Sequence, residues 1–156
     1  MFILGFVIAL FALAMTAVFL GGEMADLVDI PSLCVILVPL LGILTATNSF
    51  KVFFRGMKAV ILPKKEISEE LCNEAISLFR MLSKATAIIS SAGFIICLVN
   101  VLFALDFNDP IAINVIGPNI AAALITPLYG LVLIAVLFGP IVFILNKKFN
   151  GRKQNK

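Results

Sequence analysis

Four long stretches of this sequence carry no charged residue, and their length limits what the chain can fold into. They are Met1–Gly22, Ile30–Phe50, Ala85–Leu105 and Pro110–Asn146. A helix of about 20 apolar residues crosses a bilayer core about 30 Å thick. Each stretch reaches this length, and none alternates polar with apolar residues as the strands of a membrane barrel do. The sequence therefore predicts an all-α integral membrane protein with four transmembrane helices.

The predicted spans form a single membrane domain over residues 1–156, at about 3–21, 30–49, 85–105 and 118–145. The first is expected to be a retained helix, because it lacks a basic leading segment and an A-x-A cleavage site. At about 1.5 Å per residue the last would be about 42 Å long, so we expect it to tilt, kink or protrude.

The composition argues against most soluble functions. The chain is 62% apolar and 13% charged, whereas a soluble domain is about 45–50% apolar and about 25% charged. It has no His, its three Cys are widely spaced, and it has no phosphate-binding loop. We therefore expect no enzyme activity, no metal, no cofactor and no nucleic-acid partner.

Basic residues occur in only two places. Seven lie between residues 51 and 84 and five lie at 147–156, which accounts for all twelve, while the two other loops carry only acids. Because positive loops stay in the cytoplasm, both termini, the 51–84 loop and the 147–156 tail are predicted to be cytoplasmic. The acids of the outer loops are Glu23, Asp26, Asp29, Asp106 and Asp109.

The cytoplasmic loop begins with an amphipathic segment that Pro63 is expected to end. Its apolar side chains recur at helical spacing between basic ones: Phe50, Phe53, Phe54, Met57 and Ile61 alternate with Lys51, Arg55 and Lys58. Ser68 is predicted to cap a second helix that runs straight into the third span. Two interpretations stay open for this segment. It is a helix at the membrane surface or against a neighbouring subunit, or it is a docking surface for a cytoplasmic partner.

No ionisable residue lies inside a predicted span, so a proton carrier would have to sit on another chain. The third and fourth spans do carry small and polar residues on one face, within arcs of about 80° and about 60°. These are Thr86, Ser90, Gly93, Cys97 and Asn100, and then Asn119, Ala123, Thr126 and Gly130. Such faces are typical of close helix packing, and they also suit the wall of a water-accessible path.

Prolines interrupt the second and fourth spans. Pro39, Pro127 and Pro140 lack an N–H, so each invites a kink. Such kinks either accommodate packing or act as hinges. We expect the Thr126 hydroxyl to bond part of the backbone loosened by Pro127.

Three strings resemble helices of the MotA family, whose relatives are ExbB and TolQ. Asp26–Gly42 (DLVDIPSLCVILVPLLG) resembles the first outer turn and second helix, and Gly117–Ile141 (GPNIAAALITPLYGLVLIAVLFGPI) resembles the fourth helix. Leu4–Gly22 also fits the family's first helix, and the helix order and topology agree.

The resemblance implies a subunit of a proton- or sodium-driven stator complex in the bacterial cytoplasmic membrane. In that family a pentamer surrounds single-span MotB-type partners, which supply the titrating Asp, and helices three and four line the centre. The implied ion-path residues here are Thr86, Ser90, Asn100, Asn119 and Thr126, with Pro127 and Pro140 as kink or gating positions.

The sequence departs from that family at several places. Pro127 stands where a second Thr is typical, Ser90 replaces a proline, and only about 34 residues join spans two and three. The large cytoplasmic domain that transmits torque is therefore missing, and Glu74 and Arg80 are only candidates for pairing within a ring or with a partner. The alternative is a non-conducting structural or accessory subunit. A small solute transporter is disfavoured, because the chain shows no internal repeat or charged binding group.

Overall fold

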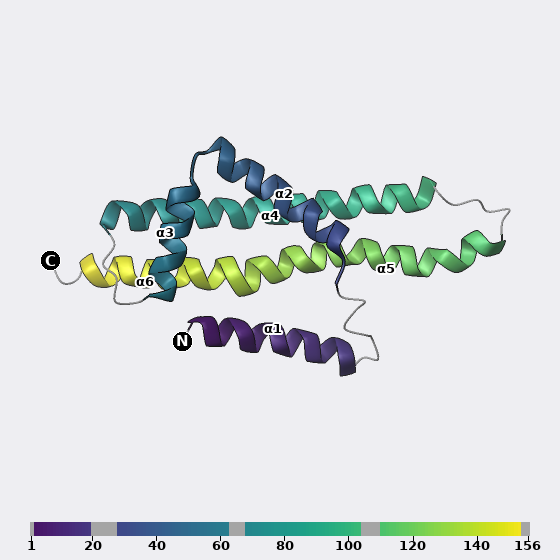
Figure 1. Cartoon of the computed structure of the whole chain (residues 1–156), viewed down its shortest axis with the longest axis horizontal. Helices are drawn as coiled ribbons and strands as arrows, with labels where there is room; N and C mark the ends of the chain where they lie inside the picture. The colour runs from purple at the N-terminus through teal and green to yellow at the C-terminus, as the bar shows by residue number, and fades with distance from the viewer. Residues whose placement is uncertain (1, 20–27, 63–67, 104–109, 154–156) are drawn as a thin grey trace.

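The computed structural model describes residues 2–19, 28–62, 68–103 and 110–153, and all regular structure there is helical (Figure 1). Two long antiparallel rods form the body of the molecule. One is α4 (Glu69–Phe103), and the other is the continuous run α5 (Pro110–Val132), η2 (Leu133–Phe138) and α6 (Gly139–Lys153). Three shorter helices lie against these rods: α1 (Phe2–Phe19), α2 (Ile30–Ala46) and α3 (Phe50–Ile61). The all-α prediction is confirmed.

Two helices in the described part of the chain are long and apolar enough to cross a membrane. They are Glu69–Phe103 and Ile116–Gly151. The pair α2 and α3 gives a third span only if the two helices, bent by 112°, count as one. Ile3–Thr16 is a shorter apolar helix. The protein is thus a membrane protein with two to three candidate spans, and the four-span topology stays a prediction.

The second predicted span ends earlier than expected. We predicted residues 30–49, but α2 stops at Ala46 and Thr47 forms its C-cap. Asn48 then adopts a positive φ of 49°, a conformation that Asn tolerates better than most residues. The chain turns by 112° into α3, which is the predicted amphipathic helix and ends at Ile61.

Helix α4 has no break where the predicted cytoplasmic loop meets the predicted span at residue 85. Its start matches the prediction, because the backbone N–H of Leu71 donates to Ser68 Oγ at 3.3 Å. Residues 69–84 of the predicted loop and the predicted third span therefore form one continuous helix.

The fourth predicted span, 118–145, is longer at both ends and carries an unexpected irregularity. The helix turns widen to π geometry over Leu133–Phe138, where the N–H of Gly139 bonds to the carbonyl of Ile134, five residues back. Pro140 follows directly and has no N–H to donate to Val136. A widened turn thus stands where we predicted a simple kink, while the backbone stays α-helical around Pro127.

The core lies where α3 crosses α4 and α6. Phe79 is fully buried there, with its ring centroid 5.3 Å from that of Phe53 and 6.1 Å from that of Phe138. Gly56 permits this crossing, because a Cβ on it would lie 3.0 Å from both Ala75 Cβ and Phe79 Cε2. Helix α3 is therefore held firmly across the two rods.

Several predicted features fall outside the described residues. These are the outer-loop acids Glu23, Asp26, Asp106 and Asp109, and the helix-ending Pro63.

Candidate functional site

Part of the small and polar face predicted on the third and fourth spans lies between helices near the start of α2. We call this region the seam, and it consists of Ser32 of α2, Thr86, Ser90 and Gly93 of α4, and Thr126 and Gly130 of α5. Thr126 on α5 is fully buried, and its hydroxyl donates to Ser32 Oγ on α2 at 2.8 Å. We had expected this hydroxyl to bond the backbone near Pro127. In the structure this hydroxyl instead joins α5 to α2, through two residues that are 94 positions apart in the sequence.

The start of α2 is held at the seam by its own cap. Asp29 caps the helix by accepting from the Ser32 N–H at 3.1 Å, and its backbone N–H donates to the Tyr129 hydroxyl at 2.8 Å. Thr126 and Tyr129 lie one helical turn apart on α5, so both reach the same end of α2. Together they fix where α2 begins on the α4–α5 pair.

Glycines bring the helices into close contact at the seam. A Cβ on Gly93 of α4 would lie 2.7 Å from Val35 Cγ1 and 3.0 Å from Thr126 Cγ2. A Cβ on Gly130 of α5 would lie 2.5 Å from Ser90 Cβ, which real side chains do not allow. Small residues at such contacts are the usual means of packing membrane helices.

The other two predicted hydroxyls are also inside the subunit. Thr86 is fully buried and donates to the Leu82 carbonyl at 2.8 Å, and Ser90 donates to the Ala87 carbonyl at 3.2 Å. Thr86, Ser90 and Thr126 therefore lie between helices of one chain. No buried side-chain N or O in the described part of the chain lacks a hydrogen-bond partner.

Asn100 and Asn119 are placed differently, because both are exposed. Asn100 follows Gly93 by seven residues and Asn119 precedes Thr126 by seven, which is about 10 Å along each helix. The two rods are antiparallel and Gly93 contacts Thr126, so the two asparagines lie at about the same level of the rods. The predicted polar face is therefore buried at Thr86, Ser90 and Thr126, and it is exposed at the two asparagines.

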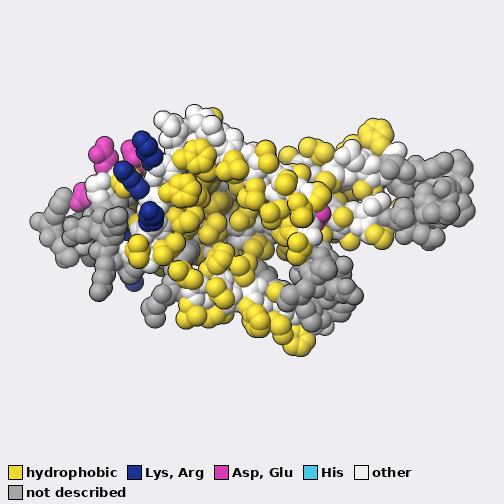
Figure 2. All heavy atoms as spheres, in the orientation of Figure 1, with side chains coloured by type: hydrophobic (Ala, Val, Ile, Leu, Met, Phe, Trp, Pro, Cys, Tyr) yellow, Lys and Arg dark blue, Asp and Glu magenta, His cyan; other side chains and the backbone are white. Residues whose placement is uncertain are grey.

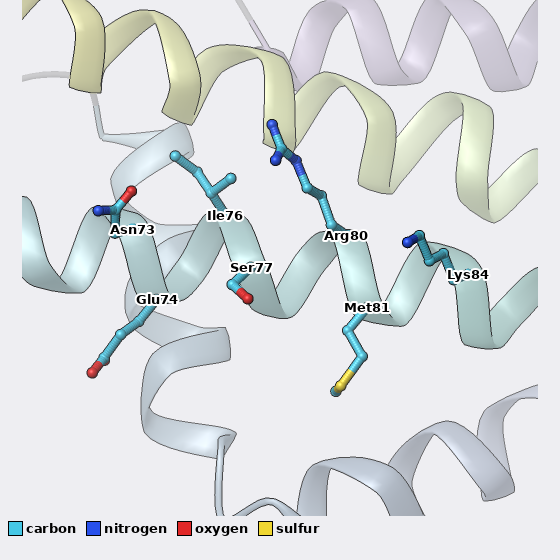
Figure 3. Close-up of a pocket in the computed structure, with 7 residues that line it drawn as sticks. All are labelled: Asn73, Glu74, Ile76, Ser77, Arg80, Met81 and Lys84. Carbon is cyan, nitrogen blue, oxygen red and sulfur yellow. The ribbon is translucent and has the colours of Figure 1, made fainter.

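Glu74 and Arg80 are both exposed on α4 and line an open groove of about 720 Å³ (Figure 3). Arg80 points toward the α6 side of the helix, as Ile76 does, while Glu74 points the opposite way, as Met81 does. The two charges therefore do not face each other within one chain.

Pro127 and Pro140 are both half-buried, and Pro140 borders a cavity. An apolar groove of about 440 Å³ separates α1 from the π segment, and Gly5, Phe6 and Ala9 line it opposite Ala135, Val136, Pro140 and Ile144. The widened turn therefore leaves room next to Pro140.

Sequence reasoning missed Ser32, although a signal was present. Ser32, Ile36, Leu40 and Leu44 recur every four residues, and all four are buried. This spacing marks the face of α2 that packs on the two rods. The Asp29–Tyr129 bond had no comparable signal, because it joins residues 100 positions apart.

The sequence of both rods matches a known family of membrane proteins. No curated protein matches the chain. A family model described as the MotA/TolQ/ExbB proton channel family matches residues 50–155, which contain α3, both rods and the seam residues of α4 and α5. The match includes the fourth-helix string Gly117–Ile141 and excludes the strings at Leu4–Gly22 and Asp26–Gly42. This family consists of non-enzymatic channel subunits, whose members work with MotB-, TolR- or ExbD-type partners. Since the match covers most of the 156 residues, the chain belongs to the MotA/TolQ/ExbB proton channel family.

Proposed function

We propose that this chain is a MotA-like subunit of a proton- or sodium-driven stator complex. It would assemble as a pentamer around a single-span MotB-like partner that supplies the titrating Asp. The observation that carries this proposal is the charge distribution on the two rods. Residues 85–105 and 110–146 contain no ionisable group of the kind that carries protons inside membranes, although their family is one of proton channels. The carboxylate must therefore come from another chain.

The position of the basic residues supports the predicted topology. Figure 2 shows that the described Lys and Arg side chains gather at the end of the molecule that carries α3, next to the edge of the apolar surface. Positive charge at one end of a membrane bundle favours the cytoplasm. We therefore place both termini and α3 on the cytoplasmic side of the bacterial inner membrane.

We place the ion path along the polar faces of α4 and α5. Asn100 and Asn119 form its outer end, because both are exposed on the subunit. These faces continue along the rods to Thr86, Ser90 and Thr126, but these three residues are buried in the seam. Their contribution requires the seam to open, and Pro127 and the widened turn at Pro140 are the points where the second rod can bend.

Glu74 and Arg80 are proposed as contacts between neighbouring copies. They are exposed and point to opposite sides of α4 (Figure 3). In a ring, opposite sides of one helix face two different neighbours, so Glu74 of one copy can meet Arg80 of the next.

Mass measurement of the complex extracted gently from its native membrane tests this proposal. The account predicts several copies of the chain, five in the simplest case, together with a single-span protein that has an Asp within its membrane helix. A lone monomer, under conditions that keep related assemblies intact, would contradict it.

The second candidate function is a non-conducting structural subunit that has kept the family scaffold. The observation in its favour is that Thr86, Ser90 and Thr126 have hydrogen-bond acceptors inside the subunit. A neighbouring gene for a single-span protein with an intramembrane Asp favours the motor, and ion flux through the purified complex separates the two functions directly.

A further inference from the structure

The outer face of α3 combines basic and large apolar side chains that the described part of the chain leaves exposed. Lys51, Arg55 and Lys58 are exposed on it, next to Phe54, which is 57% exposed, and Ile61. The opposite face is buried against the rods through Gly56, Ala59 and Val60. One face of α3 is therefore buried against the rods, and the opposite face is exposed.

The orientation of α3 differs from that of the two rods. It turns away from α2 by 112° and runs across both rods at one end of the molecule (Figure 1). Lys148 of α6 holds it there, because its Nζ donates to the Ala59 carbonyl at 2.6 Å. If the rods cross the membrane, α3 lies nearly parallel to the membrane plane.

The level of α3 is that of the membrane surface. In Figure 2 the basic side chains at this end lie along the border of the apolar surface, with acidic ones beside them and farther out. A helix in this position has apolar side chains at the depth of the acyl-chain boundary, and its Lys and Arg side chains extend to the headgroups. Exposed Phe54 and Ile61 have a favourable environment there and none in water.

We propose that this face of α3 binds the headgroups of anionic phospholipids in the leaflet on the basic side of the membrane. Lys51, Arg55 and Lys58 pair with the lipid phosphates, while Phe54 and Ile61 enter the upper acyl region. Each basic residue near an anionic membrane surface strengthens the binding of its segment to that surface by a factor of about five. The inference rests on the proposed membrane placement of the rods and not on ion conduction.

A single fluorescent residue tests the proposal. The chain contains no Trp, so Phe54→Trp gives one reporter on this face, at an exposed position that accepts the larger ring. The protein is placed in bilayer discs that contain anionic and zwitterionic phospholipid in fixed proportion, and one lipid or the other carries brominated chains. Brominated anionic lipid should quench the reporter several times more strongly per mole than brominated zwitterionic lipid. Equal quenching by the two would overturn the headgroup preference, and no quenching by either would show that a protein surface covers α3.

Two matched charge variants complete the test. Lys51→Gln/Arg55→Gln removes one Lys and one Arg, four residues apart, from the proposed face. Lys84→Gln/Lys147→Gln removes two exposed basic residues from α4 and α6, away from the proposed face and from Arg80. In the Phe54→Trp background the first variant should remove most of the preference and the second should keep it. Loss in both would mean that net charge, and not α3, attracts the lipid, and that result would also contradict the proposal. This experiment measures lipid binding alone, so neither outcome bears on the proposed ion transport.

Discussion

Thr126 contacts residues of two other helices, and the sequence around it does not indicate these contacts. Its hydroxyl bonds Ser32, and its methyl group faces Gly93 of α4. A hydroxyl in this position stabilises the junction of three helices, since an interhelical hydrogen bond in a membrane protein contributes about 0.6 kcal/mol. A variant of Thr126 alone cannot distinguish a packing role from a role in ion transport. The comparison with a variant of Ser32, the other partner of the bond, can.

Thr126→Val and Ser32→Ala form the first prediction. If the hydroxyl acts only through their mutual bond, both variants should lower thermal stability to a similar, small extent, and the double variant should add little. If Thr126 also serves the ion path, Thr126→Val should lower flux through the complex with its partner more than Ser32→Ala does. Equal flux in the two variants would remove Thr126 from the path.

Gly130 and Gly117 provide the second prediction, because both lie in α5 but in different surroundings. A Cβ on Gly130 would collide with Ser90, whereas a Cβ on Gly117 meets nothing within 4 Å. Gly130→Ala should destabilise the subunit by about 1–3 kcal/mol, the usual effect of overpacking. Gly117→Ala should be neutral or stabilising, because Ala is the better helix former. Thermal unfolding in detergent checks both, and a harmless Gly130→Ala would contradict the close contact.

At the scale of whole elements, the second rod has one irregular section. The π turns over Leu133–Phe138 end two residues before Pro140 and border the groove beside α1. A proline removes one backbone donor and crowds the carbonyl four residues back, and a widened turn is one way to accommodate it.

Pro140→Ala should restore regular α-helix, because Ala supplies the missing N–H. Hydrogen exchange in peptides that cover this section should slow, whereas Pro127→Ala, within a stretch already α-helical, should change local exchange less. Unchanged exchange in Pro140→Ala would mean that packing against α1, and not the proline, produces the π turns.

Element types were largely predictable from the sequence, and their ends were not. Apolar runs indicated helices because a bilayer leaves the backbone no other partners, and the spacing of Phe and Lys residues indicated α3. The turn at Asn48 and the continuous α4 depend on contacts with distant residues, such as Phe53 with Phe79. The site followed the same pattern: the polar faces of the two rods were visible in the sequence, whereas Ser32 and the burial of Thr86, Ser90 and Thr126 depend on where α2 lies.

At the scale of the whole molecule, α4 has an exposed apolar face opposite the seam. Ile88, Ile95 and Leu102 recur every seven residues along α4 and are all exposed. They face away from the seam, and either lipid or other protein chains must cover them. The proposed pentamer covers them with neighbouring subunits.

Charge reversal tests contact between copies. Glu74→Lys should weaken the assembly, because the reversed charge would face Arg80 of the next copy. The double variant Glu74→Lys/Arg80→Glu should recover it, since the pair is then exchanged. The fraction of assembled complex on gel filtration measures both, and a double variant weaker than the single one would exclude this pairing.

In the proposed complex, the rods enclose a helix from another chain that brings its own carboxylate. A high-resolution structure of the complex isolated from its native membrane, in a lipid disc, tests this directly. The account predicts α4 and α5 on the inside of a ring, with Asn100 and Asn119 toward a central helix that carries an Asp. A complex with α1 and α2 at the centre, and with Ile88, Ile95 and Leu102 in contact with acyl chains, would contradict it.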